Sequence, residues 1–278
     1  MRVVTLDPMH YPLTSPLGRF GVVAVSSSPQ RYVASIPVAG LVNPLTGAPT
    51  IAPMAMLVDH ICGLANHERR APDEWTVSSE LSLEVDPDAA DIVAGAPDEP
   101  VVATARPVGR KTRVAIGVCE LTHRDTVVAT ATVRSFYIPT PEDVAPFPEG
   151  PTGPPPAGTL AERMSVRVAE GGGAAVLLQD EDPVLNNMIG IVHGGVSAMA
   201  LELVGSAAVN HAVTQRADGA PLRTGSLRVN FLRPFHCGAE SRYVGTALRV
   251  GRSTGVAEAQ AVGPDGTVAI SARLTAYR

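Results

Sequence analysis

The stretch from His193 to Ser206 combines residue types that could stabilise and attack a carbonyl group. It places the pair Gly194-Gly195 at the start of an apolar segment and a single carboxylate, Glu202, inside that segment. Backbone N–H groups at a helix start lack partners and carry partial positive charge, and glycines let a substrate oxygen approach them closely. Such donors could hold a developing oxyanion while the carboxylate acts as a base or as a nucleophile.

Glu202 is expected to be buried together with its helix. Residues 196–209 are nearly all apolar whichever face is drawn, which predicts a helix buried on all sides. Desolvation disfavours the charged form of a carboxyl group, so the pKa of Glu202 is a candidate for perturbation. The alternative is that Glu202 faces a solvent cleft or a neighbouring arginine, as most helix carboxylates do.

The sequence contains a second copy of this pattern in its first half. A shift of 143 residues superposes Asn186 on Asn43, Met199 on Met56 and Glu202 on Asp59, and a shift of 142 superposes 250–252 on 108–110. A drift of one residue per segment is what changes in loop length produce, and a repeat this long is a whole domain. The chain is therefore interpreted as an internal duplication.

Three regions follow from the duplication. Residues 1–138 form the first domain and residues 159–278 the second, and each is large enough for its own core. Residues 139–158 contain eight prolines and no plausible helix or central strand. Such a proline density predicts an extended, semi-rigid linker.

Each half has one helical stretch accompanied by strand-like runs. The helices are expected at about 52–67 and 196–209. The strands are expected at 30–38, 77–85, 100–108, 113–121 and 127–138, and then at 165–179 with a turn at 171–173, 226–231, 241–250, 255–262 and 268–277. One long helix covered by a curved antiparallel sheet in each half, an α+β fold, is the economical arrangement.

Composition narrows the classes of function. The net charge of −5 gives no reason to expect nucleic acid, and no apolar run is long enough for a membrane span. The N-terminus lacks a secretory leader, so the cytoplasm is the expected compartment. Three scattered cysteines argue against a disulfide framework, and the seven histidines show no zinc-ligand spacing, so we expect no metal.

The second half resembles the hotdog-fold acyl-CoA thioesterases, in particular the phenylacetate-pathway and aroyl-CoA type. The matching residues are Asn187-x-x-Gly190-x-x-His193-Gly194-Gly195, then Glu202 and Ser206, then Leu227-x-Val229-x-Phe231-Leu232-Arg233-Pro234 and Val250-Gly251-Arg252. The resemblance implies a tandem (double) hotdog, in which two hotdog domains pair side by side with their sheets joined edge to edge. It also implies active sites at the interface between the halves.

The resemblance implies two unequal sites, because in this family the helix carboxylate comes from one domain and the helix start from the other. Site one joins Asp59 of the first half to Asn187, His193, Gly194 and Gly195 of the second half. Site two joins Glu202 and Ser206 of the second half to Asn43 and Thr50 of the first half.

Site one is expected to be the working site. Its glycines expose N–H donors, whereas the helix start of site two reads Ile51-Ala52-Pro53 and proline has no N–H group. Two features count against site one: Asp59 is shorter than Glu202, and Gly63 stands in the first half where Ser206 stands in the second. We expect Asp59 to act together with Asn187, His193 and Gly195, and we treat Glu202 with Asn43 as the secondary site.

The resemblance implies hydrolysis of an acyl-CoA thioester to a free acid and CoA, with no organic cofactor and no metal. Because CoA carries several negative charges, Arg228, Arg233 or Arg252 is expected to contact its phosphates. The double-domain chains are expected to associate further as homodimers, since hotdog pairs in the family commonly pack into larger assemblies.

Two alternatives differ in their chemistry. The chain could be a non-catalytic acyl-CoA-binding protein, because one helix start has lost its His-Gly-Gly and a fold alone does not guarantee chemistry. Less favoured is an enoyl-CoA hydratase of the same fold, whose Asp-x-x-x-x-His motif is not visible here.

Overall fold

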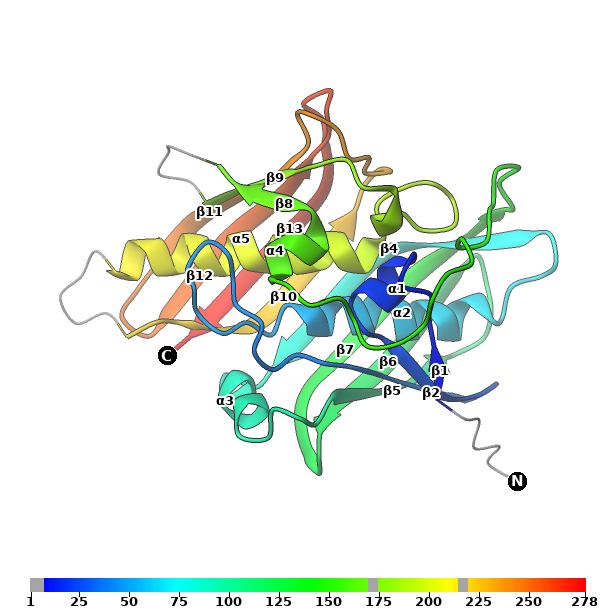
Figure 1. Ribbon diagram of the computed structural model, residues 1–278, viewed down its shortest axis with the longest axis horizontal. Coiled ribbons are helices and arrows are strands. Elements are labelled where there is room, and N and C mark those ends of the chain that lie inside the picture. Colours follow the sequence, from blue (N-terminus) through cyan, green and yellow to red (C-terminus); the bar gives the residue numbers. More distant parts are fainter. Residues whose placement is uncertain (1–7, 170–174, 215–219) are drawn as a thin grey trace.

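The computed structural model describes residues 8–169, 175–214 and 220–278 (Figure 1). The predicted turn at 171–173 lies outside the described residues. The first half contains β1 (Met9–His10), α1 (Pro16–Arg19), β2 (Val23–Ser28), β3 (Arg31–Ile36), α2 (Pro53–His67), β4 (Glu74–Val85), α3 (Ala89–Ala94), β5 (Val101–Val108), β6 (Val114–His123) and β7 (Thr126–Pro139). The second half contains α4 (Leu160–Met164), β8 (Val166–Val168), β9 (Ala175–Gln179), the short 3₁₀ helix η1 (Pro183–Leu185), α5 (Gly194–Thr214), β10 (Arg223–Phe231), β11 (Arg242–Val250), β12 (Thr254–Val262) and β13 (Val268–Tyr277).

The described strands form one antiparallel sheet that runs through both halves. Its 13 strands follow the order β1-β2-β3-β5-β6-β7-β4-β10-β13-β12-β11-β9-β8. The halves meet where β4 pairs with β10, with Leu83 opposite Leu227 and Leu81 opposite Val229. The edge-to-edge joining of the two sheets that the resemblance implied is thereby confirmed.

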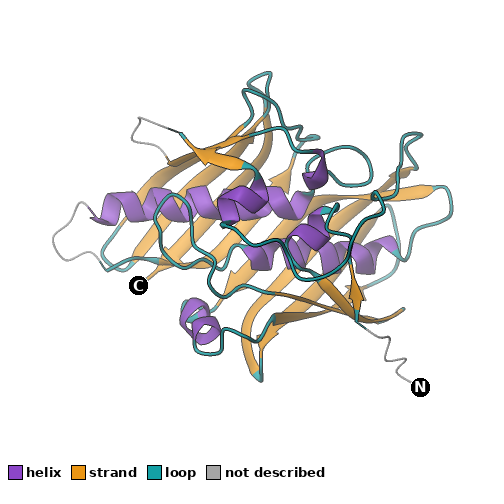
Figure 2. Ribbon diagram, viewed as in Figure 1, coloured by secondary structure: helices purple, strands orange, loops and turns teal. Residues whose placement is uncertain are grey.

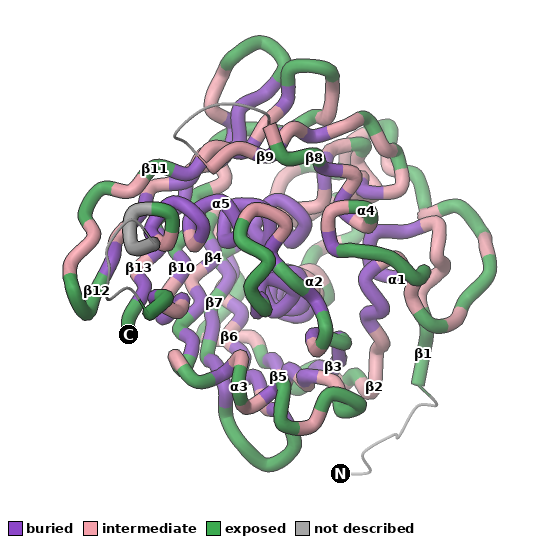
Figure 3. The backbone as a smooth tube through the Cα atoms, turned by 60° about the vertical axis from the view of Figure 1, so that its left-hand side comes forward, coloured by how far each residue is buried: buried purple, intermediate pink, exposed green. Residues whose placement is uncertain are grey.

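Both long helices lie against the same face of this sheet (Figure 2). The helices α2 and α5 run through the centre of the molecule, where most of their residues are buried (Figure 3). We call the face that they cover the inner face of the sheet and the opposite face the outer face. The predicted arrangement of one long helix per half against a curved antiparallel sheet is confirmed.

Glycines on the inner face let each helix approach the sheet closely. A Cβ atom added to Gly117 on β6 would lie 2.6 Å from the carbonyl oxygen of Cys62 on α2, and one added to Gly245 on β11 would lie 2.0 Å from that of Val204 on α5. No side chain fits at either position, because protein interiors are already packed at crystal-like density. The two halves therefore use the same device to seat their helices.

The proline-rich segment crosses both halves without regular structure of its own. Residues 140–158 form neither a helix nor a strand. Leu13 donates its backbone N–H to Pro151 at 2.9 Å, and Ala145 donates its backbone N–H to Met188 at 2.9 Å. The segment is thus hydrogen-bonded to the start of the first half and to the loop that precedes α5.

The predicted elements differ from the observed ones mainly at their ends. The helix α5 spans 21 residues, beginning two residues before the predicted start and ending five residues after the predicted end. The strand β4 begins three residues earlier than predicted. The short elements α1, α3, α4, β1 and β2 were not predicted. Among the described residues, no helix has the length and apolar character needed to cross a membrane.

Candidate functional site

Site one forms where α2 of the first half meets the start of α5 in the second half. The carboxylate of Asp59 is only 7% exposed. Its Oδ1 accepts a hydrogen bond from the Ser78 hydroxyl at 2.9 Å. Its Oδ2 lies 3.4 Å from Nδ1 of His193. Within the part of the chain that the structure describes, no hydrogen-bond donor reaches Oδ2, so this oxygen keeps its lone pairs.

His193 faces Asp59 as a neutral ring. The backbone N–H of Gly195 donates to Nδ1 of His193 at 3.1 Å, which assigns the proton of the neutral imidazole to Nε2. Burial lowers the pKa of His193, and the nearby Asp59 carboxylate raises it by a smaller amount. Near neutral pH the imidazole therefore does not neutralise Asp59.

Gly194 is the residue at which the carboxylate and the helix start meet. Its backbone N–H has no acceptor among the described residues, as expected for the first N–H of a helix. A Cβ atom added to Gly194 would lie 2.8 Å from Oδ2 of Asp59 and 3.2 Å from Cε1 of Phe231. A side chain at this position would displace the Asp59 carboxylate, so glycine allows the start of α5 to lie close to the unbonded carboxylate oxygen.

Of the two glycines expected to offer N–H donors, Gly194 keeps an N–H without an acceptor among the described residues, whereas Gly195 does not. The N–H of Gly195 is already bonded to His193. A Cβ atom added to Gly195 would lie 2.7 Å from Sδ and 2.8 Å from Cα of Met56. Gly195 thus allows α5 to contact α2 closely and holds the His193 ring in place.

Asn187 shapes the loop before α5. Its Oδ1 accepts hydrogen bonds from the backbone N–H of Ile189 at 3.0 Å and of Ile191 at 3.3 Å. The turn continues through Gly190, whose φ of +74° lies in the left-handed region that favours glycine. The amide nitrogen of Asn187 has no acceptor among the described residues and remains available to a ligand.

A tyrosine–histidine pair adjoins site one, and sequence reasoning did not find it. The hydroxyl of Tyr11 and Nε2 of His60 lie 3.0 Å apart, and the two rings meet edge to face. Burial, with a smaller contribution from the nearby His193, lowers the pKa of His60 to about 3. The pair is therefore uncharged near neutral pH, and its members lie far apart in the sequence.

Site two brings together the residues predicted for it, but each oxygen of its Glu202 carboxylate already accepts a hydrogen bond. Thr224 donates to Oε1 of Glu202 at 2.6 Å, and Thr50 donates to Oε2 at 3.3 Å. Glu202 is 2% exposed, which confirms its predicted burial and excludes the solvent-facing alternative. Burial raises the pKa of Glu202, and the two hydroxyl groups lower it by less.

Asn43 is bonded to α5 at site two. Its Nδ2 donates to the carbonyl oxygen of Leu203 at 2.9 Å and to Oγ of Ser206 at 3.1 Å. The residue of the first half that corresponds to Ser206 is Gly63. A Cβ atom added to Gly63 would meet no atom within 4 Å. Site one is therefore open where a hydrogen-bonded serine closes site two.

The loop geometry also corrects one pairing of the repeat. Asn43 accepts from Leu45 two residues ahead, just as Asn187 accepts from Ile189. Asn43 therefore corresponds to Asn187 and not to Asn186, because the loop of the first half is one residue longer. The assignment of Asn43 to site two and Asn187 to site one is unaffected.

The structure does not bring the three arginines together. Arg228 lies on the outer face and forms an ion pair with Glu84. Arg233 donates its backbone N–H to Ala269 at one end of β13, and Arg252 lies in the turn before Thr254, which pairs with Tyr277 at the other end. At 3.3 Å per residue these two ends are roughly 26 Å apart.

Two hydroxyl residues that hold the carboxylates were missed. Ser78 on β4 and Thr224 on β10 occupy equivalent places, because each directly precedes a β-bulge. A single hydroxyl in a strand gives no signal in the sequence. An alignment of the two copies that allowed a shift of 146 residues at these strands would have paired them.

Comparison with known proteins supports the architecture. Residues 189–270 match the model of the thioesterase superfamily. No curated protein matches the chain in sequence. Acyl-CoA thioesterase II TesB2 from Mycobacterium marinum is similar in structure, with a TM-score of 0.61 at 12% identity, covering 95% of this chain and 97% of that one.

Two further solved structures have the same architecture along nearly their whole length. One is the tesB protein of Mycobacterium avium subs paratuberculosis, with a TM-score of 0.57 at 12% identity, covering 91% of this chain and 95% of that one. The other is a hot dog fold protein from Alicyclobacillus acidocaldarius, with a TM-score of 0.58 at 15% identity and coverages of 94% and 97%. The chain thus has the hotdog fold in two halves, and its residues 189–270 carry the pattern of the thioesterase superfamily.

Proposed function

We propose that the chain hydrolyses an acyl-CoA thioester at site one. The observation that carries this proposal is the pairing of an unbonded oxygen of the buried Asp59 carboxylate with the unbonded N–H of Gly194. A thioester carbonyl needs both a base or nucleophile and an oxyanion donor, and these two groups supply them. The match of residues 189–270 to the thioesterase superfamily supports the same reaction.

Water is the simplest nucleophile for this geometry. Oδ2 of Asp59 removes a proton from the water as the water oxygen bonds to the carbonyl carbon, and the N–H of Gly194 stabilises the resulting oxyanion. Collapse of the tetrahedral intermediate breaks the carbon–sulfur bond, and the thiolate takes up the proton. The alternative is direct attack by Asp59, which forms a mixed anhydride that water then cleaves.

Ser78 and His193 position the carboxylate. The Ser78 hydroxyl occupies Oδ1 and so directs the reactivity to Oδ2. The neutral ring of His193 lies beside Oδ2 without donating to it, since its Nδ1 accepts from Gly195. An imidazolium at this place would pair with the carboxylate and weaken it as a base.

Site two is proposed to be structural. Both oxygens of Glu202 accept hydrogen bonds from threonines, and burial favours the neutral form of the group. Asn43, which corresponds to the free amide of Asn187, is already bonded to α5.

CoA is the proposed thiol component. The structure from Mycobacterium marinum is that of an acyl-CoA thioesterase, and its fold covers nearly all of this chain. Arg233 is the best placed of the three arginines to meet a CoA phosphate, because it lies two residues beyond Phe231, which contacts site one. Arg228 is paired with Glu84, and Arg252 lies at the far end of β13.

Thiol release from a panel of short, long and aromatic acyl-CoAs tests the proposal. We expect turnover of at least one substrate and less than a few per cent of that rate in the Asp59→Asn variant. Inactivity on every substrate would refute the proposal. Tight binding of an acyl-CoA without product over hours would identify a binding protein, and hydration of a crotonyl thioester would identify a hydratase.

A further inference from the structure

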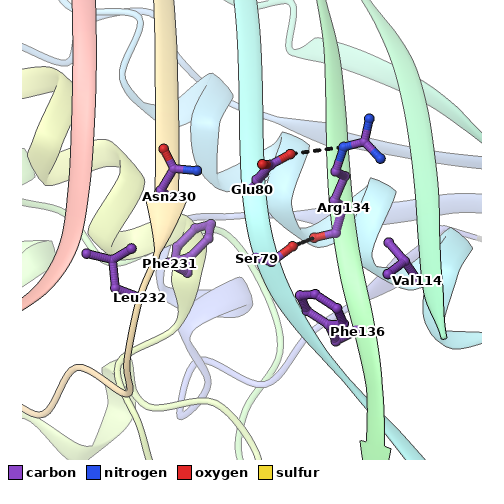
Figure 4. A pocket seen from close by; sticks show the side chains of 8 residues that line it. All are labelled: Ser79, Glu80, Val114, Arg134, Phe136, Asn230, Phe231 and Leu232. Atoms are coloured by element: carbon purple, nitrogen blue, oxygen red, sulfur yellow. Dashed lines mark hydrogen bonds and ion pairs between the residues drawn. The ribbon is translucent and has the colours of Figure 1, made fainter.

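A cavity opens on the outer face of the sheet at the seam between the two halves (Figure 4). It lies where the pairing of β4 with β10 ends, at Glu80 opposite Asn230. The β-bulge at Ser79 shifts the register of β4 against β7 at the same level. The cavity measures about 460 Å³, which falls within the range of small-ligand sites.

Half of the eight residues that line this cavity are apolar, and the other half are polar or charged. Phe136, Phe231, Leu232 and Val114 line it, and Phe136 and Leu232 remain 46% and 57% exposed. Large apolar side chains exposed together are typical of binding surfaces. The charged residues in the lining, Glu80 and Arg134, pair with each other at 2.9 Å, so they present no net positive charge to a phosphate.

Phe231 separates the cavity from site one. Its neighbours Asn230 and Leu232 point to the outer face, whereas Phe231 follows the buried residues Leu227 and Val229. Its ring lies between β10 and β4 (Figure 4). The same ring approaches within 3.2 Å of the position that a Cβ atom on Gly194 would occupy, beside the Asp59 carboxylate. One aromatic ring is thus in contact with both the cavity and the proposed reaction centre.

The equivalent place in the other half is filled. Gly225 is the bulge residue of β10, as Ser79 is of β4, and Tyr277 corresponds to Phe136 by strand register. A Cβ atom on Gly225 would lie 2.4 Å from Cδ2 of Tyr277, so the tyrosine ring covers this bulge. The outer face is therefore asymmetric, as the two sites are. The cavity lies on the side of site one, and the Tyr277 ring covers the equivalent place on the side of site two.

We propose that this cavity binds the acyl group of the substrate, a medium-length apolar chain, with Phe231 forming the wall between the acyl group and Asp59. The proposal rests on the proposed thioester hydrolysis. The thioester carbonyl lies at Gly194, the acyl chain passes the Phe231 ring through the seam, and the outer cavity receives its end.

The test fills the cavity and leaves site one unchanged. Leu232→Trp adds volume at an exposed lining position, and Leu248→Trp makes the same change at an exposed leucine on β11 as the control. The value of kcat/KM is measured for acetyl-, butanoyl- and hexanoyl-CoA. The affinity of S-ethyl-CoA and S-hexyl-CoA, two thioethers that cannot be hydrolysed, is measured by calorimetry.

In the wild type, each added methylene is expected to raise kcat/KM and affinity about fourfold, which amounts to roughly 250-fold over the four methylenes from acetyl to hexanoyl. Leu232→Trp should abolish most of this rise and change the values for the shortest ligands less than about twofold. The Leu248→Trp control should keep the wild-type profile. A Leu232→Trp variant whose dependence on chain length matches the wild type overturns the proposal.

The thioethers separate this proposal from that of hydrolysis. If the wild type releases no thiol but binds S-hexyl-CoA more tightly than S-ethyl-CoA, and only Leu232→Trp removes the difference, the acyl subsite stands and hydrolysis fails. If the wild type hydrolyses acyl-CoA with no difference between Leu232→Trp and Leu248→Trp, hydrolysis stands and the subsite fails. Absence of any binding refutes both.

Discussion

Replacing Gly194 by alanine tests the contact between the two halves at site one. The added Cβ atom would lie 2.8 Å from Oδ2 of Asp59 and 3.2 Å from Cε1 of Phe231. Carbon and oxygen atoms that are not covalently bonded lie about 3.3 Å apart or more, so the carboxylate has to retreat by roughly 0.5 Å. The Phe231 ring has to retreat by a smaller distance.

A displacement of this size at a reacting group is costly for catalysis. Misplacement by about 1 Å costs on the order of 100-fold in rate, so a shift of half that size predicts a loss of about tenfold or more in kcat. The effect on stability should be small. Alanine is favoured over glycine in helices by up to about 1 kcal/mol, which offsets part of the cost of the contact.

The matched control is Gly95→Ala at the end of α3. Gly95 has a φ of −68°, and its added Cβ atom would lie no closer than 3.4 Å to Ile92, an ordinary contact. Thiol release and urea unfolding are measured for both variants. We expect Gly194→Ala to lose activity and keep its unfolding midpoint, and Gly95→Ala to keep both. Wild-type kcat in a folded Gly194→Ala variant would refute the geometry derived for Asp59.

Three further predictions concern the titrating groups and the second site. Burial raises the pKa of Glu202 above its unfolded value of 4.5, so the stabilisation by its protonated form is complete below pH 4.5 and is lost as the pH rises through the folded pKa. In urea unfolding between pH 4.5 and pH 8, the wild type should therefore lose stability relative to Glu202→Gln, and a constant difference would contradict the raised pKa. Thr224→Val removes the 2.6 Å donor to Glu202 and should cost about 1–3 kcal/mol in the free energy of unfolding at pH 7.5. Thiol release should survive this change, and its loss in a folded variant would show that site two works. Because burial lowers the pKa of His193 below 6.5, thiol release should stay constant from pH 8 to pH 6.5 and decline only below, so an acid decline already at pH 7 would contradict a neutral His193.

Much of the fold could be predicted because both halves of the sequence carry a similar hydrophobic pattern. The apolar character of residues 196–209 predicted a helix without a solvent face, and Glu202 is indeed buried within it. The joining of the halves through β4 and β10 came from the family resemblance. Alternating residues in a strand show which side is buried, but they do not show which strand is its neighbour.

The chemistry of the two sites could be predicted only in part. The sequence indicated which residues meet at site one, but the free donor is Gly194, because the ring of His193 turns back to accept from Gly195. The bonds of Glu202 to Thr50 and Thr224 were not foreseen, since the second comes from a strand whose bulge shifts its register. The outer cavity depends on the same kind of bulge at Ser79.

The most direct test of the account compares thiol release by Asp59→Asn and Glu202→Gln on the best acyl-CoA substrate. Each substitution keeps the side chain's shape and removes its ability to act as a base. We expect a loss of at least about 100-fold in kcat for Asp59→Asn and nearly wild-type kcat for Glu202→Gln. Full activity in Asp59→Asn together with inactivity in a folded Glu202→Gln variant would contradict it and assign the reaction to site two.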